Sequence, residues 1–376
     1  KLAISMKKII FKKLSNEILF FFLISSFALT LIVWVIQAVN YLDIVTEDGH
    51  SFAVYFKYTT LSLPKIFSQL LPFIFFLSVF YTIGVYEDKN QLLVYWTHGV
   101  SKKEFINKVI KFSLIFLSIQ LLLSIIIVPH TNNKSRSFIR SSTLDFFPNL
   151  IKPKKFIDTV ENLTIFIDSK NKDGSYKNII LKDTTNRDNI QTIIAQNGEI
   201  VTKNNQKFLL LNNGQIIQTN SKKEITTFNF EQTQFDLNKY SSKTTKFPKI
   251  QELETVKIIK CTRSLLRNSG EELIFKDLVC KKNFLKNLIQ ELFKRMYLPF
   301  YIILIALTSS LLVLKSKNET NYSIFKNIVF LSGVVLIIIS EILLNLTGNN
   351  YSNNLLFLSF PILSYIAIYQ YINLRI

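Results

Sequence analysis

Six long apolar stretches frame one polar insert, and this layout constrains the fold more than any other feature. Three stretches precede the insert and three follow it, at residues 18–42, 66–86, 112–129, 296–314, 327–346 and 354–372. A bilayer core about 30 Å thick needs roughly 20 helical residues to cross it. The sequence therefore predicts an α-helical polytopic membrane protein with six transmembrane helices and an extramembrane domain inserted between helices three and four.

Lys and Arg gather in alternate short segments, which predicts the orientation of the helices. The N-terminus, the loop between helices two and three, the loop between helices four and five, and the C-terminus together hold 14 of them. The opposite loops, 43–65 and 347–353, hold only Lys57 and Lys65. Because basic residues stay on the cytoplasmic side, we expect both termini in the cytoplasm and the insert outside the inner membrane. The first stretch has no signal-peptidase site after it, so we expect an uncleaved helix, with Met6 a candidate start.

The insert has the pattern of a β domain over residues 131–250. Short strand-like runs recur, at 163–167, 178–181, 191–195, 208–211, 215–219 and 225–230. Lys172-Asp-Gly174, Asn197-Gly198 and Asn213-Gly214 lie between runs, and Asn-Gly pairs supply the positive φ angles of tight hairpins. Short strands at this spacing favour an antiparallel sandwich or open roll that can enclose an apolar trough.

Residues 251–290 show a helical pattern and form a predicted connector into the fourth membrane helix. The segment holds both cysteines, Cys261 and Cys280, on the side of the membrane where disulfides are permitted. Two interpretations stay open, and free thiols are favoured over a disulfide, because helix-borne cysteines 19 residues apart can meet only across a hairpin.

The charge of the insert has two interpretations, and several functional classes lack support. Residues 131–290 carry 27 Lys and Arg against 16 Asp and Glu, which fits either a solvated surface near anionic headgroups or attraction to an anionic lipid substrate. No glycine-rich phosphate-binding loop is present, and the three histidines are scattered. We therefore predict no catalytic residues, no metal site and no bound cofactor, and the predicted compartment disfavours nucleic acid.

A cytoplasmic segment at 86–101 carries the strongest functional signal. It places the apolar residues Leu92, Leu93, Tyr95 and Trp96 on a short helix, and Gly99 is suited to end that helix in the left-handed conformation. Two interpretations are weighed: an amphipathic helix lying on lipid, and a coupling helix that docks into a cytoplasmic motor.

With these motifs, the whole chain resembles the LptF/LptG permease family of lipopolysaccharide-exporting ABC transporters. The resemblance rests on Gln91-Leu92 through Gly99-Val100-Ser101, on Leu63-Pro64 and Leu71-Pro72, and on Glu291, Arg295 and Pro299 before helix four. In the insert, Ile165, Asp183, 195–198 and Asn213-Gly214 follow the family's periplasmic β-jellyroll. The stretch 32–43 is most like LptF forms, with LptG the alternative.

The resemblance implies a coupling site and a set of partners. The coupling residues would be Glu87, Gln91, Leu92, Tyr95, Trp96 and Gly99. The family usually has Glu where this chain has Gln91, so Glu87 or Asp88 is a candidate substitute for contacting the ATPase. The chain would pair with an LptG-type permease, sit on an LptB-type ATPase dimer that uses the ATP, and pass lipopolysaccharide to LptC and LptA.

The implied transport route places substrate between the membrane helices and then in the β-jellyroll. Helices one and five would line the membrane cavity, and Ile165, Ile180, Leu210 and Phe228 would lie on the substrate path. Glu291 and Arg295, at i and i+4, form either a helix-stabilising pair or part of a substrate site. Glu341 in helix five either faces the protein interior or, as favoured, reaches the outer interface. The rival functions are a lipoprotein-release permease with four membrane helices and a non-transporting membrane scaffold.

Overall fold

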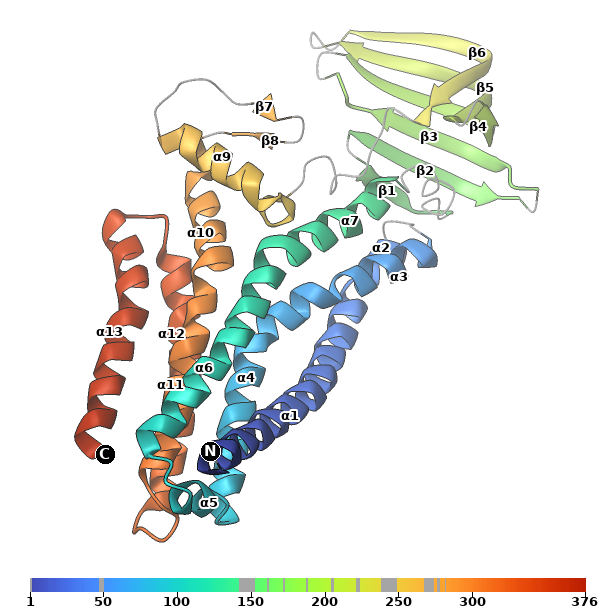
Figure 1. The fold of residues 1–376 in the computed structure, drawn as a ribbon. Helices are drawn as coiled ribbons and strands as arrows, with labels where there is room; N and C mark the ends of the chain where they lie inside the picture. The colour runs from blue at the N-terminus through green and yellow to red at the C-terminus, as the bar shows by residue number, and fades with distance from the viewer. Residues whose placement is uncertain are drawn as a thin grey trace. The chain divides into compact units, whose positions relative to one another are not determined.

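The computed structural model describes residues 2–46, 51–141, 153–160, 162–171, 173–186, 189–203, 206–220, 224–237, 249–266, 274–275, 278–280 and 282–376 (Figure 1). These residues cluster into two compact units. A helical unit comprises Lys1–Val35, Ser62–Asn133 and Pro248–Ile376, and a second unit comprises Ile36–Leu61 and Lys134–Phe247. The connector after the insert thus belongs to the helical unit, whereas the end of the first helix belongs with the strands.

Six helical spans in the described part of the chain are long and apolar enough to cross a membrane, as predicted. They are Met6–Thr46, Phe52–Asp88, Lys102–Ile139, Leu285–Leu314, Tyr322–Leu346 and Tyr351–Arg375. The elements that build them are α1 (Leu2–Asn40), α2 (Asp43–Thr46), α3 (Phe52–Leu61), α4 (Leu63–Asp88), α6 (Lys102–Leu122), α7 (Val128–Ser141), α10 (Leu285–Met296), α11 (Tyr301–Ser310), α12 (Tyr322–Leu346) and α13 (Tyr351–Arg375). The short helix α5 (Leu92–Thr97) lies between α4 and α6.

Two of these spans change helical geometry at or near a proline. Between α10 and α11 the chain forms a 3₁₀ turn, η5 (Leu298–Phe300), that contains Pro299. Between α6 and α7 it forms a π-helical segment, η1 (Leu123–Ile127). Pro129 has no N–H to give the carbonyl of Ile125, four residues earlier, and the Thr255 hydroxyl donates to that carbonyl at 2.7 Å. The third span therefore continues beyond Pro129, where the apolar stretch ends.

The core of the helical unit forms around α11, which is apolar on all sides and buried among its neighbours. The main cluster joins side chains of α1, α4, α5, α6, α11 and α12. Gly333 of α12 allows a close approach to α4, because a Cβ at that position would lie 2.1 Å from the Phe76 ring. Helix α5 is therefore part of the same core as the membrane helices.

The second unit contains one six-stranded antiparallel sheet, and its strands follow each other in chain order. They are β1 (Phe156–Val160), β2 (Leu163–Lys170), β3 (Tyr176–Asp183), β4 (Asn189–Lys203), β5 (Gln206–Asn220) and β6 (Ile225–Asp236). The inserted antiparallel β domain is confirmed. A jellyroll is built from two sheets with Greek-key connections, and the described strands form a single meander, so the jellyroll stays a prediction.

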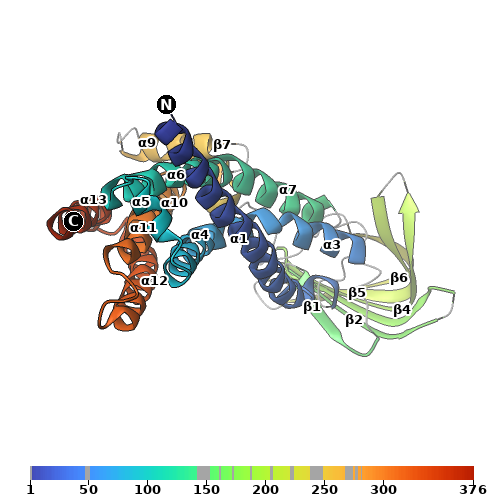
Figure 2. The same cartoon turned by 60° about the horizontal axis from the view of Figure 1, so that its bottom comes forward.

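In the same unit, α3 and α7 lie side by side (Figure 2), with the Ser135 hydroxyl donating to the Tyr58 carbonyl at 3.1 Å.

Two of the predicted hairpin turns were wrong, because both Asn-Gly pairs lie inside long strands. Asn197-Gly198 is within β4 and Asn213-Gly214 is within β5. Asn213 has φ of 52°, yet the strand does not reverse there, and the pairing with β4 keeps its register, with Gly214 opposite Ala195 and Asn212 opposite Asn197. A Cβ on Gly214 would lie 2.2 Å from the Ile194 carbonyl oxygen, so the glycine permits close strand packing. The turn at Asp173-Gly174 forms as predicted, with Gly174 at φ of 87°.

The connector differs from the helical prediction in its second half. Helix α9 (Thr255–Leu266) and α10 are helical as expected, but β7 (Ile274–Phe275) and β8 (Leu278–Val279) form an antiparallel pair between them. The predicted helical segment 251–290 also includes Leu273, which lies outside the described residues. This hairpin returns the chain toward α9.

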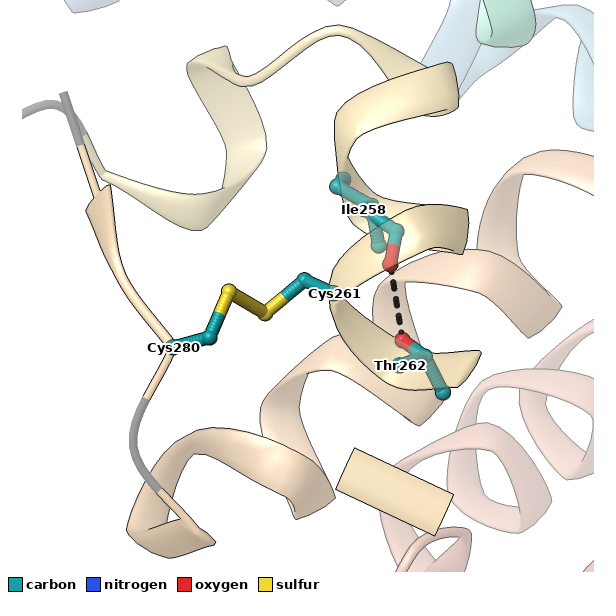
Figure 3. The surroundings of a disulfide bond; sticks show 4 residues. All are labelled: Ile258, Cys261, Thr262 and Cys280. Carbon is teal, nitrogen blue, oxygen red and sulfur yellow. Dashed lines mark hydrogen bonds between the residues drawn. A yellow bond between two sulfur atoms is a disulfide. The ribbon is translucent and has the colours of Figure 1, made fainter. Parts of the chain in front are cut away.

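The favoured prediction of two free thiols was wrong. Cys261 on α9 and Cys280 after β8 form a disulfide, with their Cα atoms 5.9 Å apart (Figure 3). Both cysteines are buried with Leu253, Ile258 and Leu288. The β7–β8 hairpin supplies the reversal that two cysteines on a continuous helix would lack.

Candidate functional site

Helix α5 has a fixed start and end on the predicted cytoplasmic segment. The Gln91 N–H donates to the Tyr86 carbonyl at 2.7 Å, and Gly99 adopts the left-handed conformation predicted for it, at φ of 72°. The Val100 N–H then bonds the Tyr95 carbonyl at 3.0 Å, which is the Schellman pattern of a helix C-terminus. The helix is therefore held in one orientation.

That orientation differs from the predicted docking surface. Leu92 and Tyr95 are 1% and 2% exposed and pack into the core of the helical unit, and Trp96 is half-buried against the same core. The exposed apolar side chains of α5 are Leu93 and Val94, at 54% and 44%. Leu92 and Tyr95 therefore anchor α5 to the membrane helices, and the surface offered to a partner is formed by Leu93 and Val94.

Lysine and aromatic side chains attach α5 to the first helix. The Lys7 ammonium donates to the Gly99 carbonyl at 2.9 Å and pairs with Glu104 at 3.0 Å. The Tyr95 hydroxyl donates to the Ile10 carbonyl at 3.1 Å. The start of α1 is thus bonded to the coupling segment.

Glu87, which the sequence predicts to contact the ATPase, points inward in the structure. Its side chain is 8% exposed, and Oε1 accepts hydrogen bonds from the Lys317 N–H at 2.7 Å and the Ser316 hydroxyl at 3.1 Å. Gln91 is half-buried and begins α5. Asp88 is exposed and pairs with Lys326 at 3.1 Å. Glu87 therefore binds the loop before α12 and is occupied within this chain.

The motif Glu291, Arg295 and Pro299 organises the junction between the connector and the fourth span. Arg295 is 2% exposed, and its Nε donates to Glu291 Oε1 at 2.8 Å. Its remaining donors reach the Leu253 carbonyl at 2.8 Å, the Thr255 hydroxyl at 3.0 Å and the Gln251 carbonyl at 3.1 Å. The guanidinium fixes the start of α9 to α10, which favours the structural interpretation of the pair.

A polar cavity of about 230 Å³ lies beside this junction within the helical unit. Its lining includes Lys65 of α4, Lys294 of α10 and Glu341 of α12. Glu341 is exposed on α12 and also borders this cavity. Glu291 neutralises Arg295, so the remaining charged residues of the lining are Lys65, Lys294 and Glu341. This excess of positive charge suits the cavity to an anionic group.

The four residues predicted on the substrate path lie on two faces of the sheet. Ile165 and Phe228 share one face, along a row of directly opposed residues that runs across five strands: Ile165, Leu181, Ile193, Ile216 and Phe228. Ile180 lies on the other face, between Phe166 and Ile194. Leu210 lies opposite Glu199 and, next to buried Leu209 and Leu211, also points to that second face.

The row across the sheet passes from buried to exposed. Ile165 and Leu181 are almost fully buried, whereas Phe228 on the edge strand β6 is 52% exposed. Successive residues of a strand point to opposite faces, so sequence alternation could assign residues to faces but could not say which face is buried. The structure identifies an apolar row that continues from the core of the sheet to its edge.

Comparison with known proteins matches this combination of helices and inserted sheet. The model of the lipopolysaccharide export system permease LptF/LptG family matches residues 13–375. The chain belongs to the LptF/LptG permease family. It is also 26% identical over 232 residues to the uncharacterized protein RP871 of Rickettsia prowazekii (strain Madrid E). That match covers 61% of this chain and 63% of the relative's length.

Membership of the LptF/LptG family limits the class of protein. The chain is a multi-pass membrane protein of a family whose model describes a lipopolysaccharide export permease. Neither the coupling segment nor the residues of the sheet are assigned roles by these matches, and their roles are argued below from geometry.

Proposed function

We propose that this chain is a permease subunit of an ABC transporter that extracts lipopolysaccharide from the inner membrane. It pairs with an LptG-type permease, with this chain in the LptF position, on an LptB-type ATPase dimer. The extracted lipid then passes to LptC and LptA on its way to the outer membrane. This chain binds no cofactor in the scheme, and ATP is consumed by the ATPase.

The observation that carries the proposal is the arrangement of α5. A six-residue helix between two membrane helices has one side locked into the core and the other side presenting two adjacent aliphatic residues, Leu93 and Val94. Apolar anchors at the centre of an interface supply most of its binding energy. A helix held in this way can receive movement from an ATPase and pass it on, whereas a helix lying loosely on lipid could not.

The orientation of the chain is proposed from charge and from the disulfide. The 14 basic residues in alternate short segments favour cytoplasmic termini. The Cys261–Cys280 bond lies in the segment that this orientation places in the periplasm, where disulfides persist. Together they support a periplasmic sheet and a cytoplasmic α5.

The apolar row of the sheet supports a route for acyl chains. Phe228 lies on β6, which pairs only with β5 among the described strands. The exposed end of the row therefore coincides with a free strand edge, where a strand of LptC or LptA can add by β-augmentation. The cavity lysines Lys65 and Lys294 suit the phosphate groups of an anionic glycolipid.

Co-purification with the ATPase tests the proposal. Replacing Val94 with Asp places a charge on the exposed face of α5 and should release the ATPase while the permease pair stays assembled. Ile9→Asp is the control, because it places the same charge on an exposed aliphatic position near the start of α1, outside α5. Full retention of the ATPase by Val94→Asp would contradict docking at α5.

A further inference from the structure

The segment 314–317, just before α12, is bonded to the chain on both sides of α5. Before α5, Glu87 accepts from the Lys317 N–H and the Ser316 hydroxyl, and the Lys317 ammonium donates to the Asp88 carbonyl at 2.8 Å. After α5, the Lys102 ammonium donates to the Leu314 carbonyl at 2.9 Å. The ends of α4 and α6, which flank α5, therefore both hold the same short segment.

Glu87 is the buried member of this set. A carboxylate at 8% exposure is stable only when donors replace its lost water. Both described donors reach the same oxygen, Oε1, and both come from the 314–317 segment. By contrast, the Asp88–Lys326 pair is solvent-exposed, and exposed ion pairs contribute little. Glu87 therefore determines how firmly the segment follows α4 and α5.

We propose that Glu87 is a positioning residue that transmits movement of α5 to α12 through the 314–317 segment. This inference rests on the proposed function, in which α5 receives movement from the ATPase. It assigns Glu87 to a joint inside the permease, whereas the sequence assigned it to contact with the motor. The joint needs one acceptor oxygen at a fixed place and does not need the negative charge itself.

That distinction defines the variants. Glu87→Ala removes the acceptor and should disconnect α12 from α5. Glu87→Gln keeps an oxygen able to accept both hydrogen bonds, and should restore the connection. Glu319→Ala is the matched control, because Glu319 accepts from the Ser316 N–H at 3.0 Å within the loop and does not reach α4.

The measurement uses the full complex with its ATPase in lipid nanodiscs that contain lipopolysaccharide. Spin labels are placed on Thr97→Cys of α5, which lies outside the Leu93 and Val94 surface, and on Ile324→Cys of α12, both exposed positions. The native cysteines are joined in a disulfide and do not compete for label. In the parent, a non-hydrolysable ATP analogue should change the spectrum of both labels. In Glu87→Ala, the change at 97 should persist and the change at 324 should disappear.

Lipid extraction per ATP hydrolysed is the functional readout. Glu87→Ala should lower it about two- to thirtyfold, the range that changes within a coupling network usually span, with the ATPase still bound. Glu87→Gln and Glu319→Ala should stay near the parent. If Glu87→Ala does not assemble, Ser316→Ala removes one of the two donors and should lower the ratio in the same direction.

The two proposals fail in different ways. If the parent complex retains no ATPase or extracts no lipid, the proposed function is wrong. If the parent works and Glu87→Ala, or Ser316→Ala in its place, keeps the ATP-dependent change at 324 and the parental extraction ratio, the role of Glu87 is wrong. Loss of the ratio in Glu87→Gln as severe as in Glu87→Ala would also overturn it.

Discussion

Arg295 of α10 donates to the carbonyl of Leu253 at 2.8 Å, across 42 positions of the chain. The same guanidinium pairs with Glu291 on its own helix. One buried side chain thus joins the connector to the fourth span.

Replacing Arg295 with Ala should destabilise the helical unit. The substitution leaves the Glu291 carboxylate and two backbone carbonyls without donors, and breaking a buried pair in this way typically costs about 3–5 kcal/mol. Heat-induced loss of the monodisperse protein in detergent measures the effect. Lys257→Ala is the control, because its pair with Glu254 is exposed. A melting temperature unchanged in Arg295→Ala would show that the network does not hold α9.

Adjacent leucines on α5 should respond in opposite ways. Leu92→Ala creates a cavity in the core and should cost about 2–5 kcal/mol of stability. Leu93→Ala should change stability by less than about 0.5 kcal/mol, as surface substitutions do, but should weaken retention of the ATPase. Thermal stability and co-purification of the two variants are compared side by side. Equal stability of both would contradict the orientation of α5.

Gly214→Ala should disturb the sheet. The added Cβ would lie 2.6 Å from the Phe230 ring as well as close to the Ile194 carbonyl, and overpacking of this kind costs about 1–3 kcal/mol. Faster cleavage of the sheet by limited proteolysis is the expected result. Thr226→Ala, at an exposed position on β6, is the control and should be cleaved at the parental rate. Cleavage of Gly214→Ala at the parental rate would contradict the close packing of Gly214 against Ile194 and Phe230.

Reduction of the disulfide should loosen the connector without releasing α9. A bond that closes a loop of this length contributes about 3 kcal/mol, whereas the start of α9 remains bound by Arg295. Protease cleavage between residues 262 and 280 should therefore rise after reduction, with the membrane helices intact.

A membrane-impermeant thiol reagent should then label both cysteines in whole cells with a permeable outer membrane. Labelling of the cysteines only after cell lysis would place them in the cytoplasm and contradict the proposed orientation.

The sequence predicted features that depend on local pattern. The length of the six apolar stretches predicted the membrane spans, and the left-handed conformation that Gly99 tolerates predicted the end of α5. Both signals depend only on the local sequence. The prediction of a hairpin at Asn213-Gly214 was wrong, because a residue with positive φ can also lie within a continuous strand, and only the pairing with the partner strands distinguishes the two cases. The same limit applied to Cys261 and Cys280, whose contact depends on a hairpin that the helical pattern hid.

The candidate sites needed tertiary structure. Leu92 and Leu93 are identical in type and adjacent, so composition could not show which faces the core. Glu87 looked free for a partner because its two donors lie about 230 positions later in the chain. The i, i+4 spacing correctly predicted the pair of Arg295 with Glu291. The contacts of Arg295 with the connector join residues about 40 positions apart in the chain, so no local sequence pattern predicts them.

Photocrosslinking on β6 tests the central claim of lipopolysaccharide export most directly. Phe228 ends the apolar row, and its neighbour Asn229 is equally on the edge strand but points to the opposite face. A photoreactive residue at 228 should capture lipopolysaccharide in the assembled complex only when ATP is present, and one at 229 should capture little in either condition. Equal capture at 228 and 229, or capture at 228 without ATP, would contradict transport along this face of the sheet.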